Sequence, residues 1–142
     1  MEISQVRKRL KSAIDQARER AQHRRQKNAE AERAYGTFLE TIATPLTRQM
    51  ANALKVEGHA FTVSTPGGGL RLASDRGRDD YVEFALDTDG DRPQVVARTS
   101  YTRGSRTLGD ERPIKPNAAP DAISEEEFLE FLVGTLEPWL ER

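Results

Sequence analysis

The sequence predicts an α+β protein with a long N-terminal helix, a second helix, a four-stranded antiparallel meander and a C-terminal amphipathic helix packed on the sheet. Three observations support this fold class. Residues 2–43 lack proline and are rich in strong helix formers. Between residues 59 and 102, apolar and polar residues alternate in short runs separated by glycine-rich turns. Residues 124–140 show apolar spacing of three and four residues.

The first helix is expected to run from near Glu2 to about Ala43. It opens with apolar residues at coiled-coil spacing, but the same register then turns basic, so about three to four uninterrupted heptads are not present. From Tyr35 onward the apolar stripe is substantial, which indicates that this end packs on other elements. The apolar residues of the first part are a candidate interaction seam: Ile3, Val6, Leu10, Ala13 (or Ile14) and Ala17.

A second helix is expected from residue 44, with both of its ends marked. Thr44 is the expected N-cap, and Pro45 fits the first helical position. Gly58 suits the left-handed residue that follows a last helical turn. Because Pro45 lacks a backbone N–H, we expect a kink or a short break between the two helices.

The middle of the chain predicts an antiparallel meander, because short alternating runs are joined by short turns. A loop over residues 105–122 follows, and a fifth, edge strand around Arg106–Leu108 stays open. The prolines of this loop exclude a central strand. The four expected strands occupy residues 59–64, 70–74, 81–87 and 94–102.

The last helix has the clearest start signal. Ser124 and Glu127 form a capping box in the sequence, and Ile123 can pack on Phe128 as a hydrophobic staple. Together these elements predict a basic helical arm, residues 1–34, followed by a compact α+β domain, residues 35–142, in a chain with a single domain overall.

Charge is distributed unevenly along the chain. The formal net charge is −1, yet residues 1–33 carry a net +5 and residues 121–142 a net −6. Such asymmetry indicates interaction surfaces or attraction between the two ends. Cysteine is absent, and no apolar run is long enough for a membrane span. We therefore expect a cytoplasmic protein with no membrane partner.

No catalytic, metal-binding or cofactor-binding residue is expected. The aspartates of "DTDGDRP" lack the glycine and glutamate positions of a calcium loop, and "TPGGG" leads into a strand, whereas a phosphate-binding loop leads into a helix. The two histidines, His23 and His59, are too few for a zinc site built on several His and Cys. Four carboxylates could pair for acid–base chemistry, but nothing places them together: Asp79, Asp80, Asp110 and Glu111.

Arginines of the predicted sheet and of the loop after it form a second candidate surface. On an exposed sheet face, Arg71 and Arg98 would lie near Glu83, and cross-strand ion pairs are the favoured interpretation. The other interpretation is an anion or partner site. Its members would be Arg71, Arg98, Arg103 and Arg106.

The basic part of the first helix has three interpretations: a solvated helix, a phosphate-binding helix and a self-association or docking helix. Asp15 and Glu19 are the two anions of residues 7–27, too few to pair with nine cations. The candidate contacts for an anion or a nucleic acid are Arg7, Lys8, Arg9, Lys11, Arg18, Arg20, Arg24, Arg25 and Lys27.

These observations lead to one hypothesis and one alternative. The hypothesis is a non-catalytic adaptor or assembly protein whose residues 1–34 bind a second copy, as a homodimer, or dock on a larger protein. The alternative is a nucleic-acid-binding protein that contacts phosphates through the basic helix.

Overall fold

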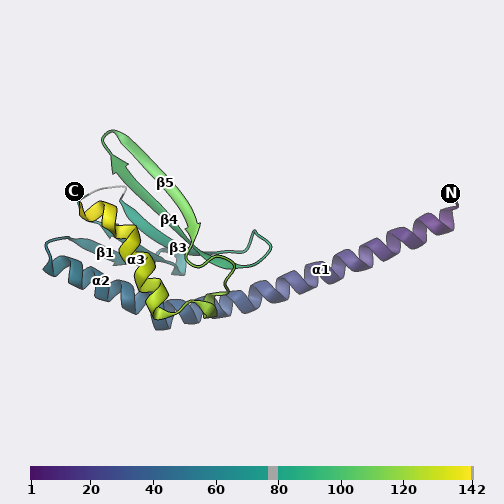
Figure 1. Cartoon of the computed structure of the whole chain (residues 1–142). Coiled ribbons are helices and arrows are strands. Elements are labelled where there is room, and N and C mark those ends of the chain that lie inside the picture. The colour runs from purple at the N-terminus through teal and green to yellow at the C-terminus, as the bar shows by residue number, and fades with distance from the viewer. Residues whose placement is uncertain (77–79, 142) are drawn as a thin grey trace. The chain divides into compact units, whose positions relative to one another are not determined.

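A computed structural model describes residues 1–76 and 80–141, and the chain divides into two compact units, Met1–Glu30 and Ala31–Arg142. The predicted α+β class is confirmed: two consecutive helices, an antiparallel sheet and a C-terminal helix follow one another along the chain (Figure 1). The elements are α1 (Ile3–Phe38), a π-helical turn (Leu39–Ala43), α2 (Thr44–Val56), β1 (Phe61–Ser64), β2 (Leu70–Ser74), β3 (Tyr81–Asp87), β4 (Gln94–Arg103), β5 (Arg106–Pro113) and α3 (Glu125–Leu140).

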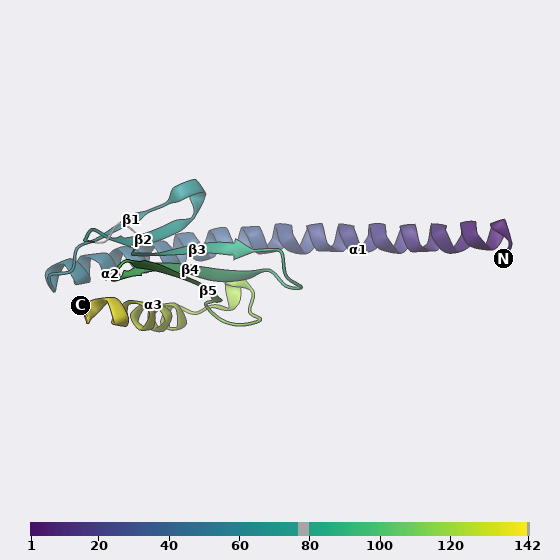
Figure 2. The same ribbon diagram turned by 90° about the horizontal axis from the view of Figure 1, so that it is seen from above.

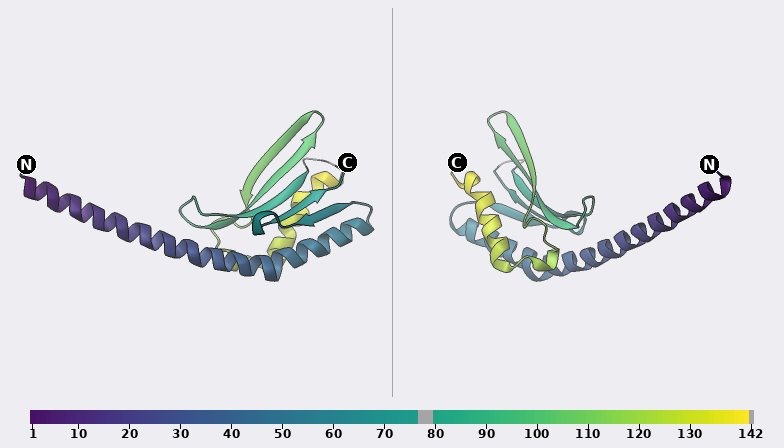
Figure 3. Two further views of the ribbon diagram at one scale, coloured as in Figure 1. Left: turned by 180° about the vertical axis from the view of Figure 1, so that it is seen from behind. Right: turned by 45° about the vertical axis from the view of Figure 1, so that its right-hand side comes forward.

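The junction between α1 and α2 is a π-helical turn and not a break. The backbone of Phe38, Ala43 and Thr44 is right-handed helical, and the Thr44 N–H donates to the Leu39 carbonyl, five residues back. Pro45 has no backbone N–H to donate to a helical hydrogen bond. The π-helical turn inserts one extra residue just before it, and the helix axis changes direction there (Figure 3). The prediction of Thr44 as an N-cap is wrong, because a residue inside a continuous helix has no free N–H groups to cap.

The C-terminal end of α2 matches its prediction. Gly58 has φ +90°, and its N–H donates to the Lys55 carbonyl over 3.1 Å. The His59 N–H reaches the Leu54 carbonyl over 2.8 Å. This pair of bonds is a Schellman motif, which satisfies two carbonyls that the ending helix leaves without intrahelical donors.

The sheet is an antiparallel meander of five strands in the order β1-β2-β3-β4-β5. The four predicted strands are present, and the open question of a fifth is settled in favour of an edge strand that is longer than expected, Arg106–Pro113. The predicted loop over residues 105–122 is therefore wrong for Arg106–Pro113, which form this strand. Pro113 ends the strand at the sheet edge, where a missing N–H removes no ladder bond to a further strand.

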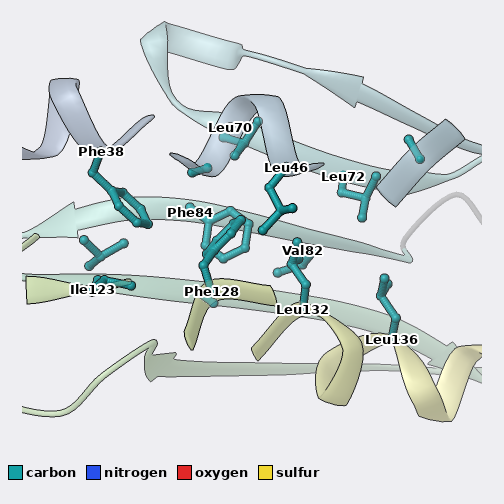
Figure 4. Close-up of a cluster of buried hydrophobic side chains, with 14 of the residues drawn as sticks. Phe38, Leu46, Leu70, Leu72, Val82, Phe84, Ile123, Phe128, Leu132 and Leu136 are labelled. Carbon is teal, nitrogen blue, oxygen red and sulfur yellow. The ribbon is translucent and has the colours of Figure 1, made fainter. Parts of the chain in front are cut away.

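One face of the sheet builds the core. Register pairs Leu72 with Val82 and Phe84 with Ala97 on this face, and α2 and α3 both cover it (Figures 2 and 4). The ring centroids of Phe84 and Phe128 lie 5.2 Å apart. The buried side chains of the sheet and α3 in this cluster are Leu70, Leu72, Val82, Phe84, Val95, Ala97, Phe128, Leu132, Leu136 and Trp139.

The predicted capping box of α3 is confirmed. The Glu127 N–H donates to the Ser124 hydroxyl over 3.1 Å, and the Ser124 N–H donates to the Glu127 carboxylate over 3.0 Å. Ile123 and Phe128 both belong to the buried cluster, as a hydrophobic staple requires. These contacts fix where α3 starts and which of its faces meets the sheet.

Candidate functional site

The first unit carries an apolar stripe on a single helix. Ile3 is 74% exposed, Val6 49% and Leu10 58%. A single helix cannot bury its own apolar stripe, because side chains three and four residues apart lie side by side on one surface. We call this surface the N-terminal stripe; it consists of the predicted residues Ile3, Val6, Leu10, Ala13 and Ala17, all exposed, and Ile14 lies beside them, 41% exposed.

The same unit carries the predicted basic residues, and every one of them is exposed. Within residues 1–30, all of which the structure describes, no Lys or Arg forms an ion pair with Asp15 or Glu19. Their charges are therefore available to an external anion or to solvent. We call them the basic segment: Arg7, Lys8, Arg9, Lys11, Arg18, Arg20, Arg24, Arg25 and Lys27.

One surface was not predicted from the sequence, the outer side of α3. Leu129 and Val133 lie one turn apart there and are 39% and 42% exposed. They fall outside the helix stripe that meets the sheet, so their spacing of four residues was the signal that could have revealed them. We call this surface the acidic face of α3; it comprises Glu126, Leu129, Glu130, Val133 and Glu137, all exposed.

The outer face of the sheet carries the expected cross-strand ion pairs. Arg71 lies 3.3 Å from Glu83, and Arg98 lies 3.5 Å from Glu111. Glu83 is also the register partner of Arg98, so positive and negative side chains alternate across β2, β3, β4 and β5. The guanidinium of Arg71 additionally stacks 4.3 Å above the Tyr81 ring.

The structure does not bring the four candidate arginines of the sheet together. Arg71 and Arg98 are separated by Glu83. Arg103 and Arg106 face each other at the hairpin between β4 and β5, where Gly104 has φ +65°. An anion site at these four residues stays a prediction that the ion pairs make less favourable, because two of its members already have carboxylate partners.

Among the described residues, two titratable groups have shifted pKa values, Tyr35 and Glu127, and both belong to the second unit. Burial, with a smaller contribution from Glu83, raises the pKa of Tyr35 to about 12. The Ser124 backbone N–H and the Lys115 ammonium, 2.9 Å from the carboxylate, lower the pKa of Glu127. Burial accounts for the first shift, and the hydrogen bonds at the start of α3 account for the second.

A groove of about 630 Å³ in the second unit lies between the π-helical turn and the turn after β1. Its charged lining residues are Glu40 and Arg48, and Pro45, Gly68 and Gly69 also line it. Among residues 1–76 and 80–141, no three His, Asp or Glu side chains gather as metal ligands would. Of the four carboxylates considered for acid–base chemistry, Asp79 lies outside the described residues, and Asp80 accepts a hydrogen bond from the Thr102 N–H over 2.7 Å.

Within the described part of the chain, no helix combines the length and the apolar character that crossing a bilayer requires. Comparison of the chain with protein-family models, with curated proteins and with solved structures finds no match. The N-terminal stripe and the acidic face of α3 are two described surfaces that combine exposed apolar residues with charge.

Proposed function

We propose that this chain is a non-catalytic assembly protein that uses its N-terminal helix to associate with a second copy or to dock on a larger protein. The observation that supports this proposal is the exposure of Ile3, Val6 and Leu10 on a unit that is a single helix. Exposed Leu or Ile is ordinary when scattered, but here the apolar residues form one ordered stripe.

Energetics favour a partner that covers the whole N-terminal stripe. Burying one Val, Leu or Ile side chain contributes about 1.5–3 kcal/mol. Association costs about 4–15 kcal/mol in lost translational and rotational freedom. Three or four apolar side chains in one helix are therefore just enough for measurable affinity, and a symmetric dimer that buries two such stripes gains twice as much.

The test uses the full chain with Val6→Gln and Leu10→Gln together. Glutamine keeps high helix propensity and removes the apolar contact. The matched control is Ser4→Gln with Ser12→Gln, which places the same residues on the opposite side of the helix. Sedimentation equilibrium should show a dimer for the parent and the control, and a dissociation constant at least about 10-fold larger for the stripe variant, since each lost apolar contact removes about 1.5 kcal/mol or more.

The proposal of self-association is contradicted if the parent chain is a monomer at high micromolar concentration. Docking on a larger protein is contradicted if the stripe variant and its control retain the same partners in a pull-down from cells that express the chain. Both results together would remove the assembly function.

A second candidate function has its own observation, the unpaired surplus of cations in the basic segment. A basic helix can neutralise phosphates without reading bases, and the affinity then falls linearly with the logarithm of salt concentration. Gel shifts with duplex DNA and single-stranded RNA test this function. Binding should weaken steeply with salt and again after Arg24→Glu with Arg25→Glu, whereas absence of binding at low salt removes this candidate.

A further inference from the structure

We propose that the N-terminal stripe of one copy binds the acidic face of α3 of a second copy. This inference rests on the proposed self-association and names the surface that receives the helix. Three observations support it: apolar residues on both surfaces, opposite charge around them, and a receiving helix whose other face is buried in the core.

The apolar parts of the two surfaces are compatible in spacing. Leu129 and Val133 are one helical turn apart, as are Val6 and Leu10. Two helices pack closely when side chains at such positions interdigitate along a shared seam. The opposite side of α3 is held in the core by Phe128, which is fully buried, so the receiving face is presented by a fixed element.

Charge favours the pairing of unlike surfaces over the pairing of two N-terminal helices. In the heptad register, Arg7 and Arg9 flank the N-terminal stripe. On α3, Glu126 and Glu130 lie along one side of the apolar pair, three residues before Leu129 and Val133. Residues 1–33 carry a net +5 and residues 121–142 a net −6. When the N-terminal helix of one copy binds α3 of another, regions of opposite charge meet, and the repulsion between two basic helices is avoided.

The rest of the heptad register also disfavours pairing of two N-terminal helices. Beyond Ala17, the seam positions of the first helix are Arg20, Arg24 and Lys27. In an in-register parallel pair of N-terminal helices, each of these cations would meet its own copy, and like charges at such positions are destabilising. An exchange in which each copy gives a helix and receives one closes a two-fold dimer and leaves neither surface free.

The sign of the salt dependence tests the proposal directly in the unmodified full chain. If the N-terminal stripe binds the acidic face, added NaCl screens an attraction and the dissociation constant of the dimer should rise at least several-fold between low and high salt. If two N-terminal helices pair with each other, salt screens a repulsion and the dimer should tighten. A dissociation constant that falls with salt therefore overturns the proposal.

Substitutions on α3 provide the second arm of the experiment. Leu129→Gln with Val133→Gln should raise the dissociation constant at least 10-fold, measured by sedimentation equilibrium on the full chain. The matched control is Val56→Gln, which replaces an apolar side chain that is 84% exposed at the end of α2 and should leave association unchanged. Circular dichroism confirms that each variant keeps its fold, as expected for exposed positions.

A charge exchange tests the contact between the basic helix of one copy and the acidic face of α3 of the other. Glu130→Arg should weaken the dimer, and combining it with Arg9→Glu should recover at least part of the loss, because the attraction is restored with its signs reversed. If the α3 variants associate like the parent while Val6→Gln with Leu10→Gln dissociates, the α3 proposal is wrong and self-association stands. If the parent never associates, both fail.

Discussion

At the scale of single residues, glycines at two helix positions have opposite requirements. Gly58 has φ +90° at the end of α2, and Gly36 lies inside α1 with no atom within 4 Å of the place a Cβ would occupy. Gly58→Ala should lower the free energy of unfolding by roughly 1–2 kcal/mol, because a Cβ is strained at that φ. Gly36→Ala should raise it by up to about 1 kcal/mol. Urea denaturation of both variants checks the pair; equal effects would contradict the assigned backbone conformations.

Tyr35 is a second residue-scale test. Its hydroxyl is buried and has no hydrogen-bond partner among the described residues, and its pKa is raised to about 12. The fold therefore favours the protonated phenol: the stabilisation is complete below the ordinary pKa of 10.0 and is lost as pH rises through about 12.

The difference in phenolate absorbance between the parent and Tyr35→Phe should show a midpoint near 12. Near neutral pH the same variant should be as stable as the parent or more stable, because it removes an unsatisfied buried hydroxyl. A midpoint near 10, or a large loss of stability, would show that the phenol is solvated or hydrogen-bonded.

The capping box should contribute stability that is lost at low pH, whereas the contribution of Tyr35 is lost at high pH. Hydrogen bonds from Ser124 and Lys115 lower the pKa of Glu127, so its contribution is present above the ordinary pKa of 4.5 and is lost as pH falls through the lower folded value. Ser124→Ala should cost about 1 kcal/mol in the free energy of unfolding at neutral pH. Glu127→Gln should flatten the acid limb of the stability profile, and an acid limb identical to that of the parent would count against this role.

At the scale of elements, the exposed ion pairs of the sheet should contribute much less to the free energy of unfolding than its buried side chains do. Arg98 and Glu111 pair at 3.5 Å, and about half of each side chain stays exposed. Arg98→Ala should therefore change the free energy of unfolding by less than about 1 kcal/mol. Leu72→Ala, at a fully buried position of β2, should cost about 2–5 kcal/mol. Thermal or urea unfolding of the two variants tests the ranking, and a larger loss for Arg98→Ala would show that the ladder is structural.

The elements that local chemistry specifies were predictable from the sequence. Period-2 alternation located β1 to β4, and Ser124 with Glu127 located the start of α3. The length of β5 was not predictable, because its side chains are mostly polar and exposed and their pattern does not distinguish a strand from a loop. β4 supplies the missing information through its hydrogen-bonding edge. The π-helical turn before Pro45 was likewise hidden, since a kink and a break have the same sequence signal.

At the scale of the whole molecule, the two units should differ in hydrogen exchange. Met1–Glu30 is a single helix, whose protection depends on the helix–coil equilibrium unless a partner packs on it. In dilute protein, its amides should exchange faster than those of β3 and β4. Their protection should increase with protein concentration in the parent and not in Val6→Gln with Leu10→Gln. Core-like protection of residues 1–30 in dilute protein would refute this expectation.

The sequence by itself determined the α+β class, the helix ends at Gly58 and Ser124, and the apolar and basic surfaces of the first helix, because caps, periodicity and charge are local properties of the chain. Only the tertiary structure decided that Arg71 and Arg98 have carboxylate partners and that β5 pairs along its length. It alone also decided that Leu129 and Val133 stay outside the core. The physical reason is that pairing and burial depend on which strands and helices become neighbours, and residues distant in sequence set those neighbours.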